Sequence, residues 1–173
     1  MRSSICPSFS LNSPAVAEVS SALSSPLLPM TELMPSEEAL AATGDGCGAA
    51  MGAANAPLAN GMFAHADETD DFEPTTKAHP GSHVVPAALA MAQRENSSGA
   101  DMITAVALGY DVCCRFLLAL GPNLVRGSHR SAEGTSSTMG SVAAAACLAK
   151  LDEAGMRYAL SYAAQQVSGI WSW

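Results

Sequence analysis

The chain is poor in aromatic and charged residues, which make up 5% and 14% of its 173 residues. A β-sandwich of this size would use more Val, Ile, Thr and aromatic residues, so this composition, rich in alanine, favours close helix–helix packing. Basic residues are also scarce: 8 Lys and Arg stand against 16 Asp and Glu, a formal net charge of −8. We therefore expect no nucleic-acid partner, because phosphates require a basic face.

Long hydrophobic runs and cysteine pairs are missing as well. No segment approaches the roughly 18 apolar residues of a membrane span, so no membrane partner is expected. The five cysteines show no CxxC spacing, which favours a reducing compartment. The first 30 residues hold one Arg and no continuous apolar segment, unlike a secretory signal. Together these features predict a cytoplasmic protein.

The remaining pattern predicts an all-α fold in one domain with no β-strand. Prolines divide residues 1–35 into short pieces, which predicts a poorly ordered lead-in, and residues 36–173 then form the helical domain. Apolar periodicity and capping residues predict helices over 36–44, 56–66, 81–94, 98–120, 139–151 and 153–167. The helix over 139–151 consists of small residues, so we expect it to lie at the centre.

Titratable residues concentrate in the stretch 60–86, NGMFAHADETDDFEPTTKAHPGSHVVP. It contains His65, His79 and His83 together with a group of acidic residues, and Pro and Gly interrupt any continuous helix. An irregular polar segment between apolar helices is typical of a catalytic or binding loop. A solvated acidic loop has the same composition, and this alternative stays open.

A second polar loop is expected over 126–138, RGSHRSAEGTSST, where His129 lies between Arg126 and Arg130. We predict that His79 and His129 converge on one cavity beside ionised carboxylates. Neutral imidazole can act there as acid or base, and arginine can hold a carboxylate of a substrate.

A metal-dependent hydrolase is an alternative, because His79 and His83 have i,i+4 spacing and Asp70 or Asp71 is near in sequence. The glutamate of an HExxH motif is missing. Otherwise His83 is a polar residue at the edge of its helix.

The segment NGMFAHADETDDFEPTTKAHPGSHVVPAALAMA resembles the first conserved segment of the MmgE/PrpD family. SGADMITAVALGYDVCCR, RGSHRSAEGTSSTMGSVAAAACLAKL and ALSYAAQQVSG are similar to the helices that follow it, in the same order. The resemblance implies part of a large helical domain. On this resemblance, the family's smaller lid domain, and the lysines that lie beyond this point in the family, are expected to be missing from this chain.

The resemblance assigns roles to individual residues. Asp70 and Asp71 match the family's paired aspartates, and His79 matches the histidine of HPG. His129 matches the later histidine after RG, and Glu68 stands where the family has an aspartate. These five are the expected catalytic residues. The expected substrate-binding residues are His65, Arg126 and Arg130.

The implied activity is dehydration, decarboxylation or isomerisation of a small di- or tricarboxylate, such as 2-methylcitrate in propionate metabolism. It uses no metal and no organic cofactor, and the family implies a homodimer. The chain ends at Trp173, so an inactive remnant that serves in assembly is the alternative.

Overall fold

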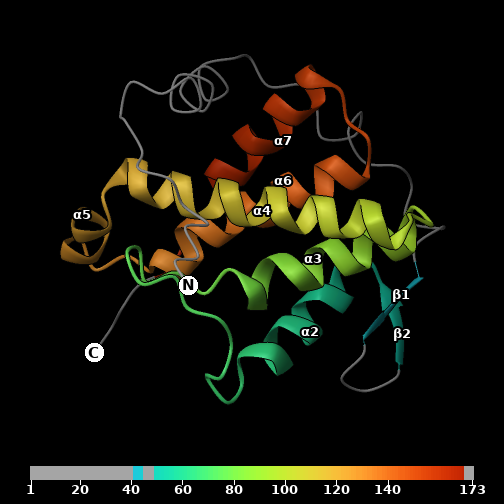
Figure 1. The fold of residues 1–173 in the computed structure, drawn as a ribbon, viewed down its shortest axis with the longest axis horizontal. Coiled ribbons are helices and arrows are strands. Elements are labelled where there is room, and N and C mark those ends of the chain that lie inside the picture. Colours follow the sequence, from blue (N-terminus) through green and yellow to red (C-terminus); the bar gives the residue numbers. More distant parts are fainter. Residues whose placement is uncertain (1–40, 45–48, 170–173) are drawn as a thin grey trace.

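The computed structural model describes residues 41–44 and 49–169, and these form a helical domain with one short pair of strands (Figure 1). The all-α fold class is therefore confirmed. The elements in chain order are β1 (Ala41–Gly44), β2 (Ala49–Gly52), α2 (Asn55–His65), α3 (Gly81–Arg94), α4 (Gly99–Leu120), α5 (Pro122–Gly127), the π-helical turn η3 (Glu133–Ser137), α6 (Thr138–Leu148) and α7 (Glu153–Gln166). The predicted lead-in, 1–35, lies outside the described residues.

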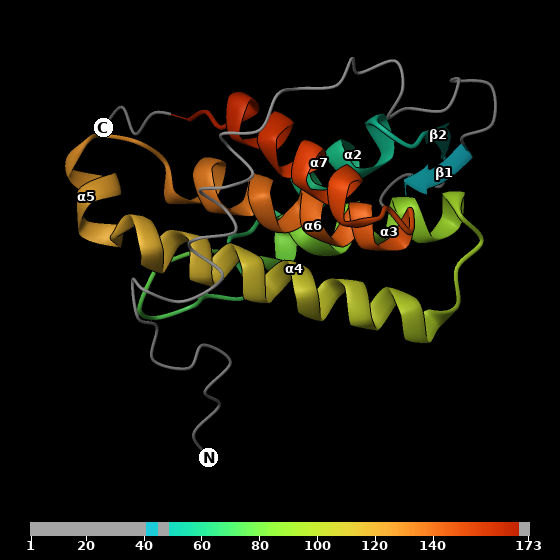
Figure 2. The ribbon, with the colours of Figure 1, turned by 90° about the horizontal axis from the view of Figure 1, so that it is seen from above.

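Helix α6 lies at the centre and packs against α3, α4 and α7 (Figure 2). Its crossing with α4 is close because Gly109 faces Gly140: a Cβ at Gly109 would lie 2.8 Å from the carbonyl oxygen of Gly140. The main core fills the space between these helices and includes the fully buried Val84, Ala105 and Ala144. Small side chains thus let the backbones approach, as the sequence predicts for this helix.

The helix ends follow from local hydrogen bonds. Ser98 caps α4, because its Oγ accepts a hydrogen bond from the backbone N–H of Asp101 at 3.2 Å. Asp152 caps α7, because its Oδ1 accepts a hydrogen bond from the backbone N–H of Gly155 at 2.8 Å. Helix α4 ends at Gly121, whose φ of 84° suits glycine.

The predicted helix over 36–44 is wrong where the structure describes it. Ala41–Gly44 pairs with Ala49–Gly52 as an antiparallel ladder, with Ala41 opposite Gly52. Alanine favours a helix only weakly, and glycines flank and interrupt this segment. Backbone pairing, with contacts from β1 to α2 and α3, outweighs that preference.

The predicted loop over 126–138 is also partly wrong, because α5 reaches Gly127 and η3 runs directly into α6. Pro122 is compatible with the first turn of α5. In η3, hydroxyl groups bond back to carbonyls four residues earlier: Thr135 Oγ1 donates to Ser131 at 2.7 Å, and Ser136 Oγ donates to Ala132 at 2.8 Å. These bonds satisfy the polar side chains inside a helical turn.

Among the described residues, α4 is the one helix long and apolar enough to cross a membrane by length and composition. A core helix of a soluble protein can pass the same test, and α4 packs against α3 and α6. The helix is therefore weak evidence for a membrane span.

Candidate active site

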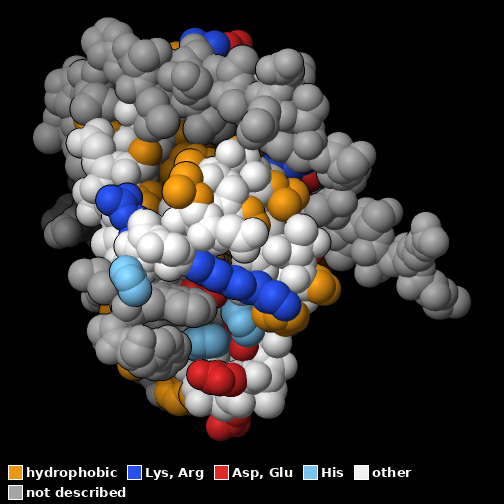
Figure 3. All heavy atoms as spheres, turned by 90° about the vertical axis from the view of Figure 1, so that its left-hand side faces the viewer, with side chains coloured by type: hydrophobic (Ala, Val, Ile, Leu, Met, Phe, Trp, Pro, Cys, Tyr) orange, Lys and Arg blue, Asp and Glu red, His pale blue; other side chains and the backbone are white. Residues whose placement is uncertain are grey.

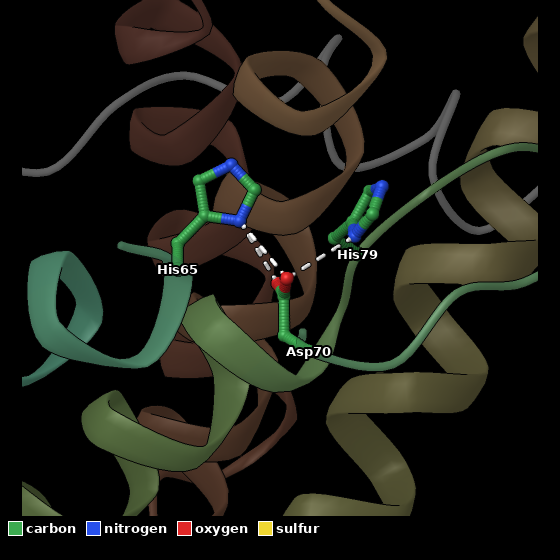
Figure 4. Close-up of side chains that lie close together, drawn as sticks. All are labelled: His65, Asp70 and His79. Carbon is green, nitrogen blue, oxygen red and sulfur yellow. Dashed lines mark hydrogen bonds and ion pairs between the residues drawn. The ribbon is translucent and has the colours of Figure 1, made fainter. Parts of the chain in front are cut away.

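The loop between α2 and α3 brings two of the predicted histidines to one carboxylate (Figure 4). His65 is the last residue of α2, Asp70 lies in the loop, and His79 precedes the start of α3. His65 Nδ1 lies 3.0 Å and 3.1 Å from the two carboxylate oxygens of Asp70. His79 Nδ1 lies 3.5 Å from Asp70 Oδ1. Asp70 therefore stands between the two rings.

Asp70 is the buried member of this group, with 6% of its side chain exposed, against 23% for His79 and 43% for His65. Burial acts to raise the pKa of Asp70. Hydrogen bonds from Ser82 and His65 outweigh it, so the pKa of Asp70 lies below its ordinary value of 3.8. The carboxylate is thus ionised at neutral pH and can stabilise a proton on either imidazole.

The 3.5 Å separation is long for a hydrogen bond. Within the described part of the chain, His79 Nδ1 is buried and has no hydrogen-bond partner. The ring of His79 thus keeps a buried nitrogen beside the carboxylate, and a proton on the ring would favour a shorter contact with Asp70.

The second aspartate of the pair, Asp71, has a different contact. Its Oδ1 accepts the amide of Gly81 at 2.8 Å, at the first residue of α3. Burial raises the pKa of Tyr110, and the charge of Asp71 and a hydrogen bond to it raise the pKa further. A Cβ at Gly81 would overlap Asp71 and Tyr110. Asp71 therefore fixes the start of α3 rather than an imidazole.

Glu73 closes the loop that carries His79. Its carboxylate accepts the amides of Thr75 and Thr76 at 3.1 Å and 2.6 Å, and its backbone pairs with Lys77 and Ala78. Burial acts to raise the pKa of Glu73, but the hydrogen bonds from Thr76 and Thr75 lower it below 4.5. Sequence reasoning did not single out this carboxylate, because nothing in the spacing marks it as a loop cap.

A pocket of about 440 Å³ is lined by residues of α2, of this loop and of α3, and the lining includes Asp70 and Asp71. A second pocket, which we call the histidine pocket, has a volume of about 550 Å³. The histidine pocket is lined by His65, Glu68, Phe72, Lys77, His79, His83, Arg126, Ser131 and Glu133. Basic, acidic and imidazole side chains gather together on this face of the molecule (Figure 3).

Lys77 is a cation of the histidine pocket that the sequence did not reveal. Its Nζ lies 4.7 Å from the centre of the Phe72 ring, which in turn lies 5.4 Å from the His79 ring. Lys77 has a φ of 66°, a turn conformation uncommon for a residue with a side chain. Lys77 and His79 line the same pocket with Phe72, an arrangement that the spacing of these residues in the sequence does not predict.

Arg126 supplies the second cation from the end of α5. Its Nη2 donates to the carbonyl of Thr76 at 3.4 Å. Its Nε is buried and has no partner among the residues described. This arginine therefore connects the two predicted loops and retains hydrogen-bonding capacity.

The structure does not bring His129 and Arg130 to the histidine pocket: both are exposed and neither lines it. His129 sits in a tight turn with a φ of 58°, directly after the end of α5. His79 and His129 therefore do not meet in one pocket. From the second predicted loop, Arg126 rather than His129 lines the pocket with His79. Glu68 does line the pocket and is exposed.

The structure also does not bring together the metal ligands considered for a hydrolase, which were His79, His83 and an aspartate. His83 Nδ1 lies 3.1 Å from the carbonyl oxygen of His79 and 3.0 Å from the Ser82 hydroxyl. The donor atoms that do converge, within 4.8 Å of one another, belong to His65, Asp70 and His79.

No curated protein and no solved structure matches the chain significantly. The MmgE/PrpD N-terminal domain matches over residues 12–173, a range that contains every helix described above. The match agrees with the resemblance carried by the loop 60–86 and by the helices after it. The chain therefore belongs to the MmgE/PrpD family and comprises that family's N-terminal domain.

Proposed function

We propose that the histidine pocket binds a small di- or tricarboxylate, such as 2-methylcitrate, and that His79 moves a proton at a carbon next to a carboxylate. The observation that carries this proposal is the His79 ring beside ionised Asp70, in a pocket that also holds Lys77 and Arg126. Dehydration, decarboxylation and isomerisation of such acids share this proton transfer. The reaction needs no metal or organic cofactor in this scheme.

His79 is the proposed general base. Its Nδ1 faces Asp70, so its Nε2 is left for the substrate. Asp70 would stabilise the imidazolium formed when the ring takes the proton, and the 3.5 Å separation would shorten in that state. Asp71 contributes indirectly by fixing the start of α3, two residues after His79.

Lys77 and Arg126 are the proposed carboxylate-binding residues. Loss of the proton leaves negative charge that spreads onto the adjacent carboxylate, where two cations would stabilise it. The unpartnered Nε of Arg126 supports this role. His65 is a further donor to the substrate in this proposal.

Dehydration also requires an acid for the leaving hydroxyl group. The imidazolium of His79 is the proposed donor: the electron pair of the C–H bond forms the double bond, and the hydroxyl group leaves as water with the proton that His79 took from carbon. Glu68 lines the same pocket, and its carboxylate would orient the leaving hydroxyl group. His129 and Arg130 are exposed and lie outside the lining of this pocket, so they have no part in this proposal.

Proton exchange tests the proposal. The full chain is incubated in D2O with citrate and 2-methylcitrate, and loss of the proton signals is followed by NMR. We expect exchange above a buffer control, with a large decrease in His79→Ala and Asp70→Asn. His83→Ala is the matched control, since His83 lines the pocket but bonds to the backbone. Absence of exchange in the unmodified chain, or full exchange in His79→Ala, would refute the proposal.

Assembly is a second candidate, favoured by the apolar surface of α2. Leu58, Met62 and Phe63 are 65%, 69% and 59% exposed. We propose that this surface contributes to a homodimer. Light scattering should then give twice the monomer mass, and Met62→Lys should give the monomer mass; a monomer at every concentration of the unmodified chain would refute it.

A cytoplasmic location is also proposed. Among the described residues, Cys113, Cys114 and Cys147 form no disulfide, which suits a reducing compartment.

A further inference from the structure

Phe72 is the one hydrophobic side chain in the lining of the histidine pocket, as far as the described residues define it. It follows Asp70 and Asp71 directly in the loop, and it is 49% exposed. A single exposed aromatic residue is not unusual by itself. The two ring contacts of Phe72, however, both involve residues that the proposed reaction uses, namely Lys77 and His79.

The first contact is with a cation. The Nζ of Lys77 lies 4.7 Å from the centre of the Phe72 ring. The face of an aromatic ring carries partial negative charge and attracts an ammonium group within about 6 Å of the ring centre. Lysine has a long side chain with many rotamers, so this contact restricts where the ammonium group lies. The N–H groups that do not face the ring remain available to a carboxylate.

The second contact is with the proposed base. The ring centres of Phe72 and His79 lie 5.4 Å apart, and the two planes make an angle of 58°. The ring of His65 lies 5.5 Å from the His79 ring, and Asp70 Oδ1 lies 3.5 Å from its Nδ1. Rotation of the imidazole would change all three contacts. They therefore act together to keep Nδ1 toward Asp70 and Nε2 available to a substrate.

We propose that Phe72 is a positioning residue of the histidine pocket, whose ring holds the Lys77 ammonium group and the His79 imidazole in the arrangement that a polycarboxylate requires. This role rests on the proposed function, in which Lys77 binds a carboxylate and His79 moves the proton. Phe72 has no group that transfers a proton, so it acts through these two residues. Loss of the negative ring face should weaken binding, because the ammonium group must then be ordered when the ligand binds. Loss of the ring beside His79 should slow proton transfer, because the imidazole is then less well oriented.

The positioning is measured first on the full chain without ligand, by NMR of the Lys77 ε-methylene and His79 ring protons. The ring current of Phe72 should shift both sets of signals. Phe72→Leu should remove these shifts, and Phe72→Tyr, which keeps a ring, should retain them. Phe63→Leu is the matched control, because Phe63 is 59% exposed and lies outside the lining of the histidine pocket. Unchanged Lys77 and His79 signals in Phe72→Leu would overturn the proposal.

Binding and rate are then measured separately. Replacing Phe72 by pentafluorophenylalanine keeps the shape of the ring and reverses the charge of its face. This change should weaken binding of propane-1,2,3-tricarboxylate by about twofold to fivefold. Phe72→Leu should weaken binding by a similar factor and also lower the rate of proton exchange at saturating 2-methylcitrate by about tenfold. Phe72→Tyr should match the unmodified chain in both measurements.

The outcomes distinguish this role from the proposed function. Equal binding by the unmodified chain, the Phe72→Leu variant and the pentafluorophenylalanine chain would overturn the role of Phe72. Because Phe72 is half exposed, circular dichroism should show an intact fold for each variant; if Phe72→Leu unfolds, the pentafluorophenylalanine chain decides. Absence of both binding and exchange in the unmodified chain would instead refute the proposed function, whereas the ligand-free signals test the contacts of Phe72 alone.

Discussion

Substitution of Gly109 by alanine should destabilise the domain, because the close crossing of α4 and α6 depends on this glycine. The added Cβ would lie 2.5 Å from Val84 Cγ1, 2.8 Å from the Gly140 carbonyl oxygen and 3.1 Å from Ala144 Cβ. The carbonyl oxygen belongs to the α6 backbone, and Val84 has a restricted χ1. The helices must therefore separate locally to accept the methyl group.

Two opposing terms set the magnitude. Overpacking of a core costs about 1–3 kcal/mol, and this site belongs near the upper end because the obstruction includes backbone. Replacing glycine by alanine inside a helix gains about 1 kcal/mol. We expect a net loss of about 2 kcal/mol in the free energy of unfolding.

Urea unfolding followed by circular dichroism measures this difference. Gly99→Ala is the matched control, since Gly99 begins the same helix and no atom lies within 4 Å of an added Cβ. The control should be unchanged or more stable by up to about 1 kcal/mol. If the Gly109→Ala variant is as stable as the Gly99→Ala variant, the backbones of α4 and α6 do not approach as closely as described.

Three further predictions concern the loop, a cap and the C-terminal segment. Because the pKa of folded Glu73 lies below 4.5, its ionised form stabilises the loop above that pH and the effect is lost as pH falls through the lower value. The stability deficit of Glu73→Gln in urea unfolding should thus be largest at neutral pH and vanish in acid; a constant deficit would contradict it. Asp152→Ala removes the cap of α7 and should cost about 1 kcal/mol by the same assay, whereas no loss would show the cap to be unimportant. Gly134→Ala places a Cβ against the Ser168 carbonyl, so the amide of Ser131, which donates to Gly169 at 3.1 Å, should exchange faster with solvent; unchanged protection would count against this packing.

Much of the helical framework could be predicted from the sequence because its signals are local. Ser98 and Asp152 cap helices where their side chains reach the next amides, and Gly121 ends α4. The β1–β2 ladder could not be predicted, because it depends on backbone pairing and on contacts with α2 and α3 rather than on alanine's own preference.

The candidate site could likewise be predicted only in part. The sequence marked His65, Asp70 and His79 as candidates, and the loop brings them together. It could not separate Asp70 from Asp71, since adjacent residues in a loop can point to different elements. Nor could it choose Arg126 over Arg130, because that choice depends on where α5 ends.

The central claim is that a polycarboxylate binds beside His79, between Lys77 and Arg126. Histidine-ring NMR of the full chain during titration with propane-1,2,3-tricarboxylate tests it most directly. The account predicts saturable shifts of the His79 ring, little change at exposed His129, and weaker binding in both Lys77→Gln and Arg126→Gln. Shifts at His129 with none at His79, or equal binding in the two variants and the unmodified chain, would contradict it.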